Sequence, residues 1–169
     1  MSDTKDWTWV LRARCPECGL EASTVAGTEV PALVRGFAMR WAEVLTRPDV
    51  ADSPAPGVWS PLEYACHVRD VCRVMQLRAE QMLAEANPMF ADWDQDAAAV
   101  ADRYGEQDPV DVARELTVAA NAIAAVFASV TGDQWQRPGT RSNGSAFTVE
   151  TLAQYFVHDV VHHLHDVAG

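Results

Sequence analysis

Apolar residues recur at three- and four-residue steps in four segments of the chain, which is the spacing of helices that bury one face. These segments cover residues 28–46, 60–87, 108–132 and 148 to near the C-terminus. The second begins with Ser60, Pro61 and Glu63, which provide an N-cap, a first-turn proline and the acid of a capping box. Asp108 and Pro109 start the third in a similar way. Four such helices predict an all-α fold, an antiparallel four-helix bundle with long connecting loops.

The connections over residues 87–107 and 132–147 are longer than those that usually join antiparallel helices, and long loops are often functional. Trp93 lies in the first and Trp135 in the second, where an exposed aromatic ring could line the mouth of a pocket, but the sequence assigns neither as a binding residue. Trp7–Leu11 alternates briefly like a strand, but one short strand cannot form a sheet. We therefore predict one domain over residues 1–169, with residues 1–27 as an N-terminal extension.

The composition is that of a globular domain with an acidic surface. Of the 169 residues, 49% are hydrophobic and 22% are charged, and 24 acidic against 13 basic side chains give a net charge of −11. This charge argues against binding to nucleic acid or to an anionic membrane. No apolar run approaches the roughly 20 residues of a membrane span, and no secretory signal is evident. We expect a cytoplasmic protein with reduced cysteines.

Histidines are concentrated near the C-terminus. His158 and His162 are four residues apart, so on a helix their imidazoles project from the same side. A third imidazole from His67, on a facing helix, would complete a three-ligand metal site with an open position, as in catalytic zinc sites. Imidazoles near a helix C-terminus are also favoured by the helix dipole without any metal, and His67 alone could be an ordinary buried histidine. The spacing leaves both interpretations open.

Three carboxylates lie close to these histidines along the chain. Asp70, Asp159 and Asp166 are placed to accept a hydrogen bond from a ligand imidazole and so orient it. The alternative is that Asp159 and Asp166 form solvent-facing pairs with His163 or with arginines.

Cysteine provides a second candidate for metal or redox chemistry. Cys15 and Cys18, in the run C-P-E-C-G, form half of a zinc-ribbon knuckle, but the sequence offers no second half. A redox pair would need a thioredoxin-like unit, which the pattern does not predict. We expect a reduced pair in a surface turn, with a metal or redox role as the alternative.

Two runs of sequence resemble a known family. Trp59–Asp70 (W-S-P-L-E-Y-A-C-H-V-R-D) and Tyr155–Asp166 (Y-F-V-H-D-V-V-H-H-L-H-D) resemble the DinB/YfiT-like superfamily, and within it the actinobacterial branch of mycothiol-dependent, maleylpyruvate isomerase-like enzymes. The resemblance extends from the first helix to the last. It implies a four-helix bundle, a three-ligand metal site and a homodimer. The ligands that it implies are His67, His158 and His162.

The resemblance also implies a class of activity. A divalent ion, with zinc as the first candidate and nickel or iron as alternatives, would activate a low-molecular-weight thiol such as mycothiol. The thiolate would then be transferred to a small electrophile or would assist its isomerisation. One alternative is a metal-dependent hydrolase that uses the same ligands and a nearby carboxylate as general base. The other is a non-catalytic metal- or ligand-binding module. No catalytic residue is assigned by the sequence.

Overall fold

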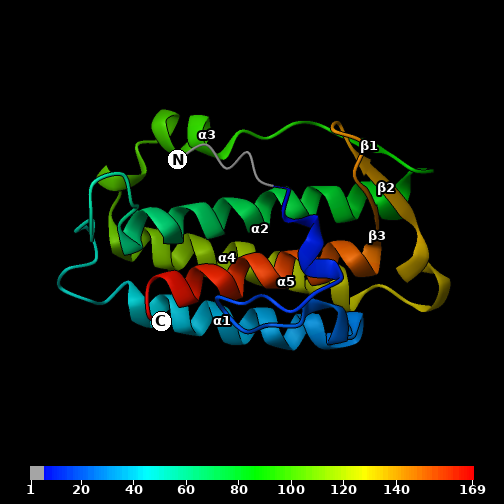
Figure 1. The fold of residues 1–169 in the computed structure, drawn as a ribbon, viewed down its shortest axis with the longest axis horizontal. Coiled ribbons are helices and arrows are strands. Elements are labelled where there is room, and N and C mark those ends of the chain that lie inside the picture. The colour runs from blue at the N-terminus through cyan, green and yellow to red at the C-terminus, as the bar shows by residue number, and fades with distance from the viewer. Residues whose placement is uncertain (1–5) are drawn as a thin grey trace.

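The computed structural model describes residues 6–169, which form a bundle of four long helices flanked by short elements (Figure 1). The long helices are α1 (Val30–Val44), α2 (Pro61–Ala84), α4 (Pro109–Ala128) and α5 (Val149–Asp166). Helices α4 and α5 each pack against both α1 and α2. The four-helix bundle expected from the sequence is confirmed. None of the described helices has the length and apolar character needed to cross a membrane.

The helix start signals of the sequence act as expected. The Ser60 hydroxyl accepts a hydrogen bond from the Glu63 backbone N–H at 3.2 Å, and the Glu63 carboxylate accepts one from the Ser60 N–H at 2.7 Å. The Asp108 carboxylate accepts from the Val110 N–H at 2.8 Å. These caps satisfy backbone donors that the first helical turn leaves without a partner.

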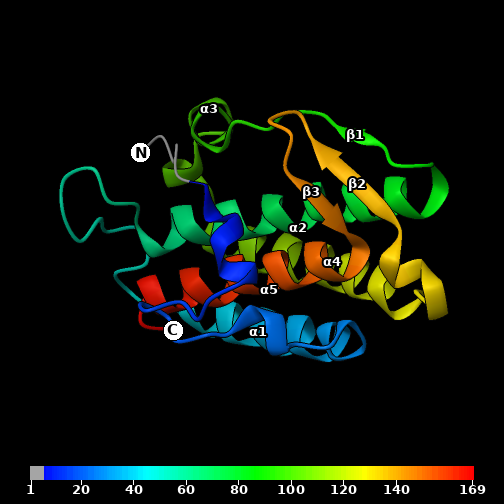
Figure 2. The same cartoon turned by 45° about the vertical axis from the view of Figure 1, so that its right-hand side comes forward.

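The two long connections pair with each other across one end of the bundle (Figure 2). They form a small sheet from β1 (Met89–Phe90), β2 (Pro138–Arg141) and β3 (Ala146–Thr148), in which β2 runs parallel to β1 and antiparallel to β3. The first connection also contains the short helix α3 (Gln95–Ala101). Strands of two to four residues are too short to show an alternating pattern, which is why the sequence analysis missed them.

The one segment with a strand-like pattern is not a strand. Trp7–Leu11 forms a 3₁₀ turn that starts where the Asp6 carboxylate accepts a hydrogen bond from the Thr8 N–H at 2.9 Å. The N-terminal extension then crosses α5, and its turns at Trp7–Leu11 and Ala22–Thr24 both contact that helix (Figures 1 and 2). The extension is therefore packed on the bundle as part of the same structure.

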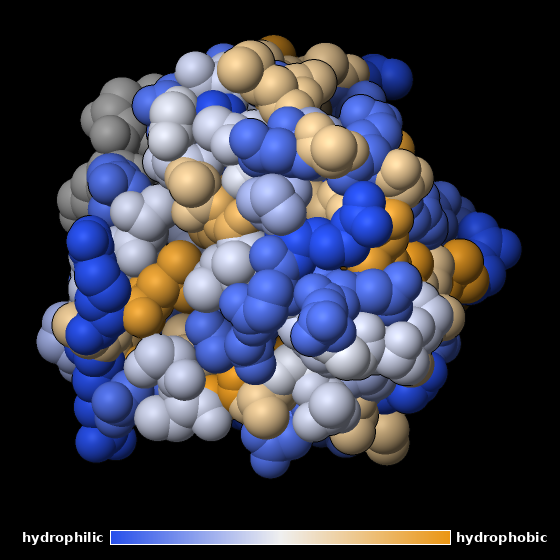
Figure 3. All heavy atoms as spheres, turned by 90° about the vertical axis from the view of Figure 1, so that its right-hand side faces the viewer, coloured by the Kyte–Doolittle hydropathy of each residue, from blue (hydrophilic) through white to orange (hydrophobic). Residues whose placement is uncertain are grey.

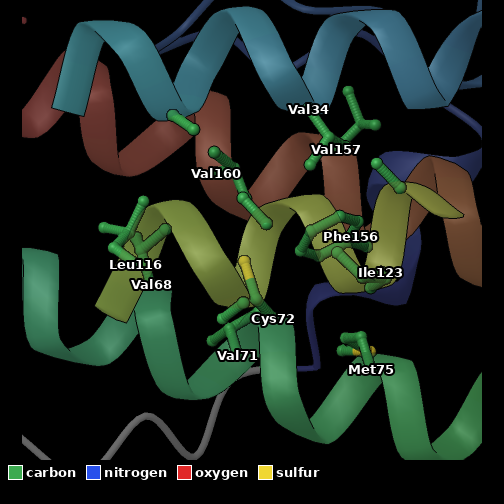
Figure 4. Close-up of a cluster of buried hydrophobic side chains, with 14 of the residues drawn as sticks. Val34, Val68, Val71, Cys72, Met75, Leu116, Ile123, Phe156, Val157 and Val160 are labelled. Atoms are coloured by element: carbon green, nitrogen blue, oxygen red, sulfur yellow. The ribbon is translucent and has the colours of Figure 1, made fainter. Parts of the chain in front are cut away.

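The core fixes the orientation of α5 about its own axis. In Figure 4, Phe156 and Val160 of α5 point into the space between the helices, toward Leu116 and Ile123 of α4. The α2 side of this core includes Cys72. Because neighbouring helix positions are about 100° apart, this apolar stripe also determines where the polar residues of α5 point.

Hydrophilic and intermediate side chains cover most of the end of the molecule that carries the sheet, and hydrophobic ones show only in separate small groups there (Figure 3). Such scattered apolar groups are normal on a protein surface.

Candidate metal centre

Helix α5 presents two polar faces, each built from residues four positions apart. His158 and His162 lie on one face, beneath the N-terminal extension. Asp159 and His163 lie on the next face and point toward α2. A shift of one residue along a helix turns the side chain by about 100°, so the two pairs serve different neighbours.

The face toward α2 brings together His67, Asp159 and His163, whose potential ligand atoms all lie within 4.8 Å of one another. The Asp159 carboxylate stands between the two imidazoles, with one oxygen 3.7 Å from His67 Nε2 and the other 3.7 Å from His163 Nε2. Both distances are longer than a hydrogen bond. Two ligand atoms bound tetrahedrally to one ion lie roughly 3.4 Å apart, so only a small movement would place a divalent ion here.

A further carboxylate orients His163 from behind. The ring nitrogen Nδ1 of His163 lies 2.9 Å from Asp166 Oδ2. If Nδ1 carries the proton and donates it to this carboxylate, Nε2 is left with a free lone pair facing Asp159 and His67. This pairing of a carboxylate with the far nitrogen is the usual support of a metal-binding imidazole. Burial raises the pKa of Asp166, but the hydrogen bond from His163 and the nearby histidine charges outweigh it, so the pKa lies below its usual value.

His67 is buried between aromatic rings. It stacks on Trp93 with ring centroids 5.6 Å apart and contacts Trp59 at 5.4 Å. Burial, together with the charge of His163, holds the pKa of His67 well below its ordinary value. A neutral imidazole is the form that binds metals. Its Nδ1 has no hydrogen-bond partner within residues 6–169, so this buried ring lacks the full set of partners that buried polar groups normally have.

The other face brings His158 and His162 together with Cys15 and Cys18 of the N-terminal extension, again with potential ligand atoms within 4.8 Å of one another. Cys15 Sγ lies 3.6 Å from His162 Nδ1. Burial, followed by the charges of His162 and His163, lowers the pKa of His158 to about 4. Cys15 is buried, which differs from the surface turn expected for this pair, because the extension folds back onto α5.

The predicted ligand set of His67, His158 and His162 is thus divided between two groups. His158 and His162 are buried, but the N-terminal extension covers them instead of α2. His67 meets the residues one position further along, Asp159 and His163, which keep the same four-residue spacing. The signal for this arrangement was present in the overlapping pairs of the run H-D-V-V-H-H, but periodicity alone did not show which pair faces α2.

A cavity of about 220 Å³ opens beside the His67 group. Its walls include His67 and Asp159, the guanidinium groups of Arg78 and Arg141, and the rings of Trp7 and Trp93. Of the two tryptophans in the long connections, Trp93 is among the lining residues, whereas Trp135 stacks on Phe127. Burial, and then the charge of Arg141, lowers the pKa of Arg78, because two like charges in a confined space oppose one another.

Asp70, a candidate to orient His67, has other partners. Its carboxylate accepts hydrogen bonds from the Tyr104 hydroxyl at 2.6 Å, from Arg69 at 2.9 and 3.2 Å and from Arg73 at 2.9 Å. Asp70 therefore anchors α2 to the following loop. Its role is structural.

The remaining cysteines are buried thiols. Burial raises the pKa of both Cys66 and Cys72 to about 12, and nearby carboxylates add to this effect. A thiol with so high a pKa is unreactive near neutral pH. Neither residue is a candidate nucleophile.

Comparison with known families shows to which family the chain belongs. A model described as the DinB superfamily matches residues 32–167, which is most of the sequence. This chain belongs to the DinB superfamily. The match includes His67, Asp159 and His163 and excludes Cys15 and Cys18. Within residues 32–167, the DinB-superfamily chain therefore carries one complete candidate metal group.

One solved structure is similar to this DinB-superfamily chain over nearly its whole length. It is YfiT from Bacillus subtilis, described as "a probable metal-dependent hydrolase with an unusual four-helix bundle topology". The two share 19% sequence identity with a TM-score of 0.71, and the match covers 93% of this chain and 89% of YfiT. At this identity the likeness shows the fold. Comparison with curated proteins finds no significant match.

Proposed function

We propose that this protein is a divalent-metal-dependent enzyme whose ion is held by His67, Asp159 and His163. The observation that carries the proposal is the meeting of these three side chains, two of which, His67 and Asp159, line a cavity. Two imidazoles and a carboxylate are the donor set of many catalytic sites, in which coordination positions remain open. When bound, such an ion lowers the pKa of a thiol or a water beside it and so supplies a nucleophile at neutral pH.

The chain's own residues define the kind of substrate. Arg78 and Arg141 line the cavity and would pair with one carboxylate or other anionic group of a substrate, whereas Asp94, Asp96 and Asp159 in the same lining would repel further negative charge. Trp7 and Trp93 add aromatic side chains to its lining. A cavity of about 220 Å³ suits a small molecule. The proposed substrate is therefore a small anionic electrophile.

The proposed nucleophile is the thiol of mycothiol, on the strength of the resemblance to the actinobacterial, mycothiol-dependent branch of the family. The reaction would be transfer of the thiol to the substrate or a thiol-assisted isomerisation. Zinc is the first candidate for the ion, with nickel and iron as alternatives, because imidazole and carboxylate ligands suit all three.

Hydrolysis is the second candidate function, and one observation favours it. Asp94 and Asp96 also line the cavity, and a carboxylate beside the substrate is what a hydrolase needs as general base. YfiT, the similar structure, is described as a probable metal-dependent hydrolase. Turnover with labelled water and with mycothiol separates the two: consumption of thiol supports transfer, and incorporation of water oxygen supports hydrolysis.

The site itself is tested by elemental analysis of single variants. His67→Ala and His163→Ala should each contain one equivalent of metal less than the wild type. His165→Ala, which removes an exposed imidazole on the same helix, should keep the full content. The double variant His67→Ala/His162→Ala distinguishes the two ligand sets: it should lose only one equivalent if His67, His158 and His162 bind the same ion, and more than one if His67 and His162 bind different ions. Unchanged metal in His67→Ala and His163→Ala would refute the site.

The homodimer implied by the family resemblance stays a prediction. Sedimentation equilibrium of the purified protein would test it.

A further inference from the structure

We infer that Cys15, Cys18, His158 and His162 form a second metal site, a closed zinc site that fastens the N-terminal extension to α5. This inference goes beyond the proposed function and does not depend on it. The two sites share no ligand. The DinB superfamily match begins at residue 32, so the cysteines lie outside the part of the chain that the family describes.

The ligand set and its spacing fit zinc. Two thiolates and two imidazoles make up one of the common structural zinc sites, which are tetrahedral and leave no position open. With zinc bonds of about 2.3 Å to sulfur and about 2.0 Å to nitrogen, a tetrahedral site places a sulfur and a nitrogen roughly 3.5 Å apart. Cys15 Sγ and His162 Nδ1 are 3.6 Å apart, and all four ligand atoms lie within 4.8 Å of one another.

The cysteine turn has the form needed to direct both thiols to one point. The Cys15 N–H donates to the Leu20 carbonyl at 2.8 Å, and the Gly19 N–H donates to the Cys15 carbonyl at 2.9 Å. Gly19 adopts a φ of +75°, which residues with a Cβ adopt only at a cost. Backbone hydrogen bonds therefore form a tight turn that contains both Cys15 and Cys18. No disulfide occurs among the described cysteines, so the sulfurs are available as ligands.

The histidine side shows two features expected of metal ligands. His158 is 4% exposed, and its Nε2 has no hydrogen-bond partner within residues 6–169. A buried polar atom without a partner is costly unless something else binds it. His162 directs Nδ1 to Cys15, and its Nε2 lies 3.3 Å from Glu17 Oε2. A carboxylate on the far nitrogen of an imidazole is the support expected for a metal ligand.

The site links the extension to the cavity. Trp7 contacts the rings of His158 and His162, with centroids 5.9 and 5.3 Å away, and the same tryptophan lines the cavity beside His67. Zinc at the cysteines would therefore keep one cavity wall in place while taking no part in the chemistry. Its binding would be coupled to the folding of the extension and would release the thiol protons.

Cobalt substitution of the full chain tests the inference. Thiolate ligands give cobalt(II) an intense charge-transfer band in the near ultraviolet, which ligation by imidazole and carboxylate does not produce. The band should appear in the wild type and in His67→Ala, and it should be lost in the Cys15→Ser/Cys18→Ser variant. Cys72→Ala removes a buried thiol outside the site and should keep the band. A band that survives loss of both cysteines, or that is absent from the wild type, would overturn the inference.

Two measurements on the unaltered chain keep the test decisive if the cysteine variant fails to fold. Titration with a mercurial should release one zinc ion per chain as the two thiols of Cys15 and Cys18 react. Chelation should also speed trypsin cleavage after Arg12 and Arg14, which lie in the extension. Zinc that stays bound while these thiols react, or cleavage that is equally fast with and without metal, would contradict the site. Because His67→Ala removes only the other ion, failure of one site is distinguishable from failure of the other.

Discussion

The hydrogen bond between Asp166 and His163 offers a sharp test of how the proposed catalytic site is organised. Replacing Asp166 by Ala removes the acceptor 2.9 Å from His163 Nδ1. Loss of a hydrogen bond to a charged group costs about 1.5–3 kcal/mol. Loss of a carboxylate behind a metal-binding imidazole typically weakens metal binding about 10–100-fold, which corresponds to about 1.4–2.7 kcal/mol. The two figures agree, so we expect Asp166→Ala to weaken binding at His67, Asp159 and His163 by that factor.

The conservative variant separates orientation from charge. An amide oxygen in Asp166→Asn can still accept from His163 Nδ1, but it carries no charge, so the affinity should fall between those of the wild type and Asp166→Ala. Asp111→Ala removes an exposed carboxylate that pairs with Arg114 on α4 and serves as the control. It should bind metal like the wild type.

The assay is competition for zinc against a chromophoric chelator. Asp166 Oδ1 also lies 3.8 Å from His162 Nε2, so the measurement should be made in the Cys15→Ser/Cys18→Ser background, where only the site at His67 remains. The reasoning is refuted if Asp166→Ala binds zinc as tightly as its parent while His163→Ala has lost the ion. In that case His163 is a ligand that needs no carboxylate to orient it.

Three predictions concern stability and are read out by thermal or chemical denaturation. Gly139→Ala should lower the free energy of unfolding by about 1–3 kcal/mol, because the new Cβ would lie 2.5 Å from Phe90 Cζ. Gly36→Ala, which adds a Cβ in open space on α1, should raise it by about 0.5–1 kcal/mol. Equal effects of the two substitutions would contradict this reasoning. Ser60→Ala should cost about 1 kcal/mol through loss of the α2 cap, and a neutral result would argue against it. Asp70→Asn should cost about 2 kcal/mol at pH 7, since the carboxylate accepts from Arg69, Arg73 and Tyr104. Burial raises the pKa of Asp70 but these partners outweigh it, so the folded pKa lies below the unfolded value of about 3.9, and the difference from wild type should shrink only below about pH 4.

The bundle could be predicted because its signals are local. The cap at Ser60, the proline after it and the acid at Glu63 specify where α2 begins regardless of what the helix packs against. The small sheet could not be predicted, because its strands are two to four residues long and are defined by pairing between two distant loops. The 3₁₀ turn at Trp7–Leu11 was mistaken for a strand-like segment for a similar reason, since five residues carry too little periodicity.

The histidines of α5 illustrate the same limit more sharply. One pair of residues with four-residue spacing on this helix was singled out from the sequence, but two overlapping pairs have that spacing. Which pair faces His67 depends on how α5 is turned about its axis when Phe156 and Val160 pack in the core. The two possibilities differ by a rotation of about 100°, which the sequence does not reveal. The partners of Cys15 were also hidden, because the histidine 3.6 Å from it follows 147 residues later.

The position of Trp7 has a practical consequence for anyone who trims the protein. A shortened version that starts at Val30 would retain all four long helices and the three side chains around His67, and would satisfy the family match. It would nevertheless lack the tryptophan that walls the cavity and would leave His158 and His162 uncovered. A piece that spans only the family match and a piece that also keeps the Trp7 side of the cavity are therefore different lengths of chain.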